Sequence, residues 1–147
     1  MSPDEVATFL DECRSLSMCT VNADGSVHAV AMWYGLVDGQ IVVQTKAKSQ
    51  KIRNLVRNPR LTVLVDAGEK YEELRGVELV GRAELVTDPD QLWAIGVAVY
   101  ERNSGPYSES VRPAIERTLN KRVGVRLLVE RADSWDHRKL SALGASH

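Results

Sequence analysis

The stretch from Val27 to Asp66 constrains the fold most, because it changes from one hydrophobic pattern to another. Residues 27–36 form an apolar and aromatic run, and Asp38-Gly39 separates this run from a second one at 41–45. An Asp-Gly pair between two such runs is a strong signal of a β-hairpin. We therefore predict a strand, a tight turn and a return strand over the first half of this stretch.

The second half of the stretch predicts a short basic helix and then a buried strand. Ser49 is a good N-cap, and Asn58-Pro59 ends the helix because the residue before a proline avoids the helical conformation. At about 100° per residue, one face of the helix is apolar and contains Ile52, Leu55 and Val56. Its edges contain Lys51, Asn54 and Asn58 on one side, and Arg53 and Arg57 on the other. The following run, 61–65, is nearly all apolar, which is typical of a central strand covered on both faces.

Lys51 stands in the first turn of this helix, where its charge opposes the helix dipole. Unpaired backbone N–H groups in that turn already favour an anion. A further cation there indicates a partner with more than one negative charge, and Lys46 and Lys48 lie just upstream. Phosphate fits this pattern. The residues alone equally allow a solvated basic face that only keeps the protein soluble.

The whole chain has the pattern of a single, mainly β domain spanning residues 1–147. The predicted elements are a helix from Ser2, strands at 18–21, 27–36 and 41–45, a helix at 49–58, strands at 61–65 and 74–87, helices from Asp88 and at 111–122, and a strand at 123–130. This order, α-β-β-β-α-β-β-α-α-β, favours an antiparallel β-barrel with flanking helices, because no strand-helix-strand alternation continues long enough for a parallel sheet. The tail from Ala132 to His147 has no predicted element.

Two details of the later strands can be checked against the structure. Gly81, inside the strand 74–87, predicts a β-bulge or a close backbone approach. In the last strand, alternate residues are expected to point inward, namely Val123, Val125, Leu127 and Val129.

Composition excludes several classes of function. The formal net charge is −1, which argues against a dedicated nucleic-acid binder. No apolar run approaches the ~20 residues that a membrane helix requires. The first residues are acidic and helical, unlike a signal sequence, so we expect a cytoplasmic protein. The three histidines are too scattered to predict a metal site.

Two motifs resemble a known superfamily. Thr45, Ser49, Lys51 and the Asn58-Pro59 stop fall as they do in the pyridoxamine 5'-phosphate oxidase-like, FMN-binding split β-barrels, and the strand motif at 75–84 is similar to a later strand of that superfamily. The similarity covers roughly residues 9–129 in the order of elements. Within the superfamily, the run from Lys51 to Leu55 looks most like members that use the deazaflavin coenzyme F420.

This resemblance implies a cofactor site and its residues. The short helix would hold the phosphate end of a flavin-type cofactor, and the ring would lie along the strand before it. The implied cofactor-binding residues are Lys51 and Asn54 in the helix, Thr45 and Ser49 near the phosphate, Lys46 with Lys48 and Arg57 near an anionic tail, the backbone of Val30, Ala31 and Met32 at the ring edge, and Trp33 against the cofactor or the substrate. The resemblance also implies a homodimer, because split barrels build this site between two subunits.

The chain departs from the pyridoxamine oxidases at positions that bind phosphate. An Arg and a Lys of those oxidases, five residues apart on a strand, correspond to His28 and Trp33, and the Arg before the helix lysine is replaced by Gln50. Their C-terminal substrate-binding motif is not recognisable in 134–140. These departures argue against vitamin B6 oxidation and favour the deazaflavin over FMN.

The sequence shows no nucleophile-base constellation, so a bound cofactor is expected to supply the chemistry. The leading hypothesis is an oxidoreductase in which reduced F420 transfers hydride to a small conjugated substrate, with no catalytic side chain assigned. The alternatives are an FMN-dependent oxidoreductase and a non-catalytic split barrel that binds a flavin or haem-type ligand. A nucleic-acid contact through residues 46–60 is disfavoured because aromatic side chains are missing from that segment.

Overall fold

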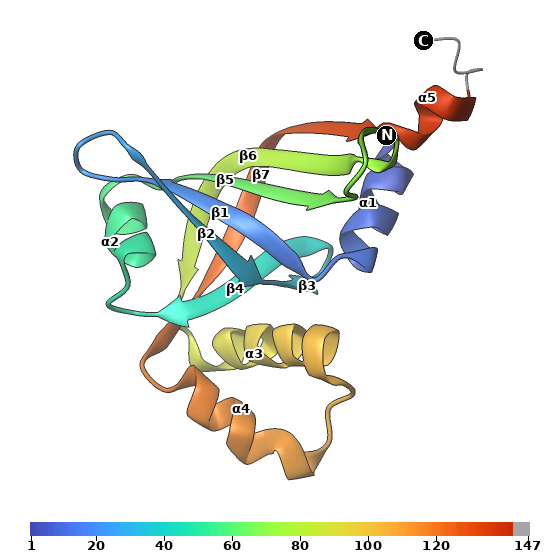
Figure 1. Cartoon of the computed structure of the whole chain (residues 1–147). Coiled ribbons are helices and arrows are strands. Elements are labelled where there is room, and N and C mark those ends of the chain that lie inside the picture. The colour runs from blue at the N-terminus through green and yellow to red at the C-terminus, as the bar shows by residue number, and fades with distance from the viewer. Residues whose placement is uncertain (143–147) are drawn as a thin grey trace.

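The computed structural model describes residues 1–142 and shows one curled, antiparallel sheet with helices around it (Figure 1). Seven strands pair in the order β2-β1-β5-β6-β7-β4-β3. The strands are β1 (Ser15–Val21), β2 (Val27–Trp33), β3 (Gly35–Val37), β4 (Gln40–Lys46), β5 (Arg60–Ala67), β6 (Arg75–Val86) and β7 (Arg122–Asp136). The helices are α1 (Pro3–Glu12), α2 (Gln50–Arg57), α3 (Pro89–Ser104), α4 (Arg112–Leu119) and α5 (Arg138–Ala142), with 3₁₀ turns at Tyr71–Glu73 and Glu109–Val111. The predicted class, an antiparallel barrel with flanking helices, is confirmed.

The inner face of the curled sheet forms the main hydrophobic core. Alternate residues of each strand point into it, as the period of two requires, and on β5 these are Leu61, Val63 and Val65. Helices α1 and α2 lie at opposite ends of the curled sheet in Figure 1, and both contribute to this core. Phe9 enters it from α1, and Ile52 enters it from α2.

Helix α3 covers part of the outer face and creates a second, smaller core. That core consists of Val42, Val86, Ile95 and Val99. Gly35 allows α3 to pack directly on the sheet, because a Cβ at that position would lie 2.9 Å from the backbone nitrogen of Val99. Helix α4 follows below α3 in Figure 1, so the α3–α4 pair forms a separate layer on one side of the barrel.

The run 27–36 was predicted as one strand, and this prediction is wrong. The run divides into β2 and β3 at Tyr34. The Tyr34 side chain is fully buried in the main core, and its hydroxyl donates a hydrogen bond of 2.5 Å to the carbonyl oxygen of Leu10. Anchoring to α1 at this point turns the chain, so β3 pairs with β4 at the opposite edge of the sheet from β2.

The predicted bulge at Gly81 is confirmed. The register of β6 against β7 shifts between Val80 and Gly81, which leaves Glu130 without an opposite residue. A Cβ at Gly81 would lie 2.0 Å from the carbonyl oxygen of Leu128, so only glycine fits. The bulge ends the inward alternation of β7, and Val129, predicted to point inward, is exposed.

The C-terminal tail has more structure than the sequence indicated. β7 continues to Asp136, and α5 follows it. Residues 143–147, the rest of the tail for which no element was predicted, lie outside the described residues. None of the helices within residues 1–142 has the length and apolar character needed to span a membrane.

Candidate functional site

Helix α2 has the predicted bounds but a different orientation. The Ser49 hydroxyl caps it by accepting a hydrogen bond from the Ile52 N–H, and the helix ends at Arg57, before Asn58-Pro59. Ile52 is buried as predicted. Val56 is 70 % exposed, so its predicted place on the buried face is wrong. The buried sector of α2 is rotated toward Asn54, which is fully buried.

Polar partners at the end of β1 and just after it explain this rotation. The Asn54 amide nitrogen donates to the Thr20 hydroxyl at 3.0 Å and to the Asn22 side-chain oxygen at 2.9 Å. Its amide oxygen accepts a hydrogen bond of 2.8 Å from Gln50. A buried amide is stable when its donors and acceptors are satisfied in this way. The geometry therefore shows Asn54 holding α2 against the end of β1, and the cofactor contact that the resemblance implies for it stays a prediction.

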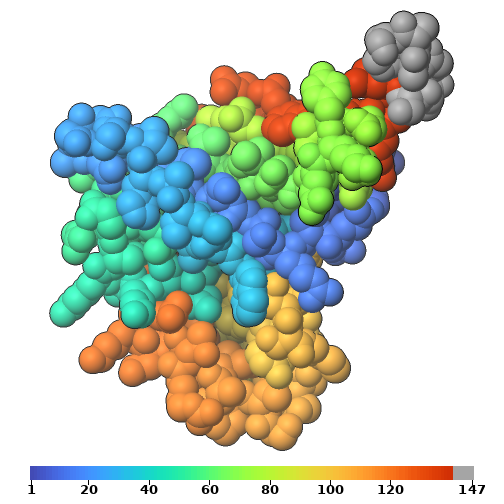
Figure 2. Space-filling model, viewed as in Figure 1, coloured from blue at the N-terminus to red at the C-terminus, as the bar shows by residue number. Residues whose placement is uncertain are grey.

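A basic pocket lies where the end of β4 meets the turn between α4 and β7. We use the name basic pocket for this hollow of about 840 Å³. Its residues are Lys46, Ala47, Lys48, Arg117, Thr118, Asn120, Lys121 and Arg122. None of these described lining residues is acidic. In Figure 2 the blue-green segment after β4 lies above the orange α4.

Strand pairing builds this pocket from distant parts of the chain. In the β4–β7 ladder Lys46 lies opposite Arg122, and the Ala47 N–H donates to the Lys121 carbonyl oxygen at 3.0 Å. Sequence reasoning identified Lys46 and Lys48. It missed Arg117, Lys121 and Arg122, because only the register of β7 against β4 brings them to the same place.

Lys51 belongs to the same positively charged region. Burial lowers the pKa of its ammonium group, and the nearby positive charge of Arg122 lowers it further. No acidic residue occupies the first turn of α2. Arg122 in turn donates a hydrogen bond of 3.1 Å to the Gln44 side-chain oxygen. An anion in this region would relieve the repulsion between these cations and would be favoured by the start of α2.

Thr45 and Ser49 differ in whether their hydroxyl groups are placed to donate a hydrogen bond to an anion. Thr45 is buried, and it alternates along β4 with the exposed Lys46, so its side chain points to the inner face of the sheet. The Ser49 hydroxyl accepts the helix cap and keeps its own O–H as a donor. Ser49 is therefore the better placed of the two predicted hydroxyls.

The strand predicted to carry the ring, β2, is an edge of the sheet. Hydrogen bonds from the Asn22 N–H to Ser26 and from the Tyr34 N–H to Arg14 fix which backbone groups pair with β1. Since paired and unpaired residues alternate in an antiparallel ladder, Ala29, Ala31 and Trp33 direct their N–H and C=O groups to the open edge. Val30 and Met32 pair with β1, so of the three predicted backbone contacts only Ala31 presents free groups.

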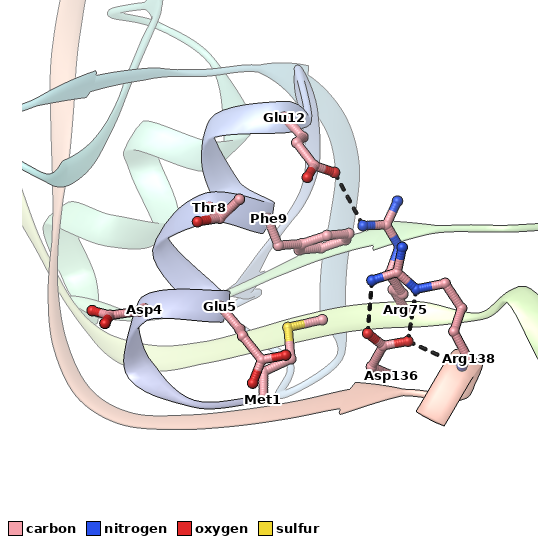
Figure 3. Close-up of a pocket in the computed structure, with 9 residues that line it drawn as sticks. All are labelled: Met1, Asp4, Glu5, Thr8, Phe9, Glu12, Arg75, Asp136 and Arg138. Atoms are coloured by element: carbon pink, nitrogen blue, oxygen red, sulfur yellow. Dashed lines mark hydrogen bonds and ion pairs between the residues drawn. The ribbon is translucent and has the colours of Figure 1, made fainter. Parts of the chain in front are cut away.

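A second charged hollow, of about 210 Å³, lies beside α1 (Figure 3). Here the charges pair with one another: Arg75 bonds Glu12 at 3.0 Å, and Arg138 bonds Asp136 at 2.8 Å. The hydrogen bonds from Arg138 lower the pKa of Asp136 to about 2. This hollow ties α1 to the end of β7 and to α5, and we interpret it as structural.

Comparison with known proteins shows which family the chain belongs to. A family model for pyridoxamine 5'-phosphate oxidase matches residues 2–136. The chain belongs to the pyridoxamine 5'-phosphate oxidase family. The resemblance noted in the sequence is thereby confirmed. No curated protein matches the chain.

Among solved structures, a conserved hypothetical protein from Mycobacterium tuberculosis is 47 % identical with a TM-score of 0.93, over 96 % of this chain and 88 % of that one. An F420 reductase is 24 % identical with a TM-score of 0.65, over 86 % and 94 % of the two chains. A haem storage protein from Vibrio cholerae is 19 % identical with a TM-score of 0.70, over 91 % and 94 %. The last two similarities show the shared fold.

Within the pyridoxamine 5'-phosphate oxidase family, this chain has His28 and Trp33 where the pyridoxamine oxidases have an Arg and a Lys. Five residues apart on β2, the two side chains point to opposite faces of the strand. His28 is half-buried on the inner face, and its Nδ1 atom is buried without a hydrogen-bond partner within residues 1–142. Trp33 is 59 % exposed on the outer face. Neither side chain supplies the permanent cation that the corresponding residues of the pyridoxamine oxidases bring to a phosphate.

Proposed function

We propose that the protein is an oxidoreductase that uses coenzyme F420 to transfer hydride to a small conjugated substrate. The observation that carries the proposal is the basic pocket beside the start of α2. Together with Lys51 it gathers six cations, none of which takes part in an ion pair within residues 1–142. Such a set of unpaired cations suits a ligand with several negative charges.

Different residues would bind the phosphate, the glutamate tail and the ring of the coenzyme. Lys51 and the Ser49 hydroxyl would bind its phosphate at the start of α2, and the cations of the basic pocket would bind its glutamate tail. The backbone groups of Ala31 and Trp33 at the open edge of β2 would orient the ring. When bound, the reduced coenzyme would supply the hydride, and solvent would supply the proton that completes the reduction. The chain itself would bind the coenzyme, orient its ring toward the substrate and exclude water from the site.

The main alternative is FMN in place of the deazaflavin. FMN ends in a single phosphate monoester, which leaves most of the basic pocket without a charged partner. The phosphodiester and glutamate carboxylates of F420 would extend over it. A non-catalytic flavin or haem-type carrier is the third possibility, and the similarity to a haem storage protein, being one of fold, does not favour it over the other two.

We further propose a homodimer that completes the ring site. The outer side of β2 exposes Val27 and Trp33, with the small residues Ala29 and Ala31 between them. An exposed apolar strip on the outer face is a candidate for packing against another chain, which leaves the backbone groups at the edge of β2 for the ring. Light scattering at micromolar concentration should give twice the chain mass, and a strictly monomeric species with cofactor present would contradict this.

Separate titrations with F420, FMN and a deazaflavin lacking the phosphate and tail test the proposal. F420 should bind most tightly, and the truncated deazaflavin should lose most of the affinity. Purified protein that holds stoichiometric, non-dialysable FMN would overturn the choice of cofactor. Tight F420 binding without hydride transfer to any conjugated ketone or quinone would favour the non-catalytic alternative.

A further inference from the structure

A second pocket, of about 250 Å³, lies between α3 and α4. We call it the helix pocket. Helix α3 contributes Val99 and Tyr100 to its wall, and α4 contributes Ile115 and Thr118. The ends of β2 and β4 reach it through Trp33 and Gln44. The two helices approach closely because residue 96 is glycine, where a Cβ would lie 2.7 Å from Leu119 Cδ1.

The side chains of the helix pocket restrict the chemistry of an occupant. None of its lining residues within 1–142 is charged. A charged group moved into such a pocket would lose its hydration without gaining a counter-ion, so the occupant must be neutral. The Tyr100 and Thr118 hydroxyls can each donate a hydrogen bond, which suits a carbonyl or similar acceptor oxygen.

The volume restricts the size of the occupant. An apolar cavity of about 150 Å³ accepts benzene, and sites for drug-sized ligands occupy about 300–1,000 Å³. A pocket of about 250 Å³ lies between these values. It therefore suits a flat molecule of one or two rings.

The helix pocket adjoins each part of the proposed cofactor site. Trp33 belongs to the open edge of β2, where the ring is proposed to lie. Gln44 bonds Arg122 of the basic pocket, and Thr118 lines both pockets. We propose that the helix pocket binds the substrate, and that this substrate is a small neutral ring compound with an acceptor oxygen. The identification of the occupant as a substrate rests on the proposed function, whereas the binding itself does not require the cofactor.

The test is an NMR titration of the full-length protein without cofactor. The probes are 1-tetralone, which is neutral with a carbonyl oxygen, naphthalene, which lacks the oxygen, and 1-naphthoate, which is charged. The chain has three indole N–H groups, at Trp33, Trp93 and Trp135, and only Trp33 lines the helix pocket. Tetralone should shift the Trp33 signal saturably and leave the other two in place. Stronger binding of naphthoate, or shifts at Trp93 or Trp135 instead, would overturn the proposal.

Two variants test whether tetralone binds in the helix pocket. Ala114→Phe places a large ring at an exposed residue of α4 that lines the pocket, and it should abolish the tetralone shift. Ala94→Phe, at an exposed residue of α3 outside the pocket, is the matched control and should bind as the parent does. Equal binding by both variants would rule out this pocket.

Tyr100→Phe keeps the proposal testable if Ala114→Phe does not fold. Loss of one neutral hydrogen bond should weaken tetralone roughly three- to tenfold and leave naphthalene unchanged. Equal loss for both probes would contradict the assigned role of the hydroxyl. Tetralone binding without F420 binding would refute the proposed function and retain the pocket, and the reverse result would refute the pocket alone.

Discussion

Two of the charged hollows within residues 1–142, the one beside α1 and the basic pocket, differ in whether their charges are paired. Beside α1, arginine and carboxylate side chains bond one another, as Arg75 bonds Glu12 and Arg138 bonds Asp136. In the basic pocket, Lys46, Lys121 and Arg122 have no acidic neighbour among the lining residues described. Paired charges are satisfied by the fold itself. Unpaired cations held close together raise the energy of the fold, and an anionic ligand lowers it again.

This difference predicts different consequences of mutation. Substitutions among the paired charges should change stability and leave ligand binding alone. Substitutions among the unpaired cations should change binding and leave stability alone.

The largest expected effect is on stability, at Arg102 of α3. Its guanidinium side chain is 11 % exposed, donates to the Cys13 carbonyl oxygen at 2.9 Å, and lies 4.7 Å from the centre of the Tyr34 ring. It satisfies carbonyl groups at the end of α1, and hydrogen bonds from a charged group contribute about 1.5–3 kcal/mol each. Arg102→Met should lower the free energy of unfolding by about 3 kcal/mol in urea titrations.

Arg112→Met is the control for Arg102, because Arg112 also lies over an aromatic ring, 5.0 Å from the centre of Trp93, but its ion pairs with Glu109 and Glu116 are exposed. Pairs of that kind contribute about 0–1 kcal/mol. Equal losses for the two variants would show that the buried contacts of Arg102 have no special weight.

The second expected effect is on binding, at Lys51. Lys51→Ala should weaken F420 by about 1.5–3 kcal/mol, a roughly ten- to hundredfold loss of affinity, because a charge-assisted hydrogen bond to phosphate is removed. Stability should change by no more than ~0.5 kcal/mol, with a slight gain possible because a cation leaves the start of a helix. Calorimetric titration and urea unfolding of the same preparation measure both quantities.

Lys139→Ala removes the same charge at the other hollow, where Lys139 bonds Glu5 at 3.0 Å. Its F420 affinity should match that of the parent. Unchanged F420 affinity in Lys51→Ala would mean that Lys51 is ordinary solvated surface, and the proposed cofactor site would fail with it.

The order of elements could be predicted from sequence because each depends on local signals. Asp38-Gly39, the Ser49 cap and the Asn58-Pro59 stop act within a few residues, and Gly81 marked its bulge correctly. The orientation of α2 could not be predicted, because it depends on Thr20 of β1 and on Asn22 just after it, far away in the sequence.

Part of the candidate site could not be predicted either, because it depends on residues that are far apart in the sequence. Lys46 and Lys51 belong to the segment that the sequence identified as basic. Arg117, Lys121 and Arg122 lie about 70 residues later, and their approach depends on the register of β7 against β4. A residue pattern within one segment carries no information about which distant strand will pair with it.

A smaller effect is expected from acid, and it belongs to the paired hollow. Asp136 is 4 % exposed, and its hydrogen bonds from Arg138 lower its pKa from 3.8 to about 2. Because the pKa is lower in the folded state, this contribution to stability is complete above pH 3.8 and is lost as the pH falls toward 2. The urea midpoint should fall over this window, less steeply in Asp136→Asn. An equal slope in parent and variant would assign the acid sensitivity to other carboxylates.

The smallest expected effect is at Val56, and it distinguishes the observed orientation of α2 from the predicted one. Val56 is 70 % exposed, so Val56→Gln removes no buried contact and replaces a β-branched residue with a better helix former. The free energy of unfolding should change by no more than ~0.5 kcal/mol, and F420 affinity should not change. On the face predicted from helical periodicity, the same substitution would bury an amide in the core and cost several times as much. A loss of more than about 2 kcal/mol in urea unfolding would restore that prediction and would separate Asn54 from its partners at the end of β1 and just after it.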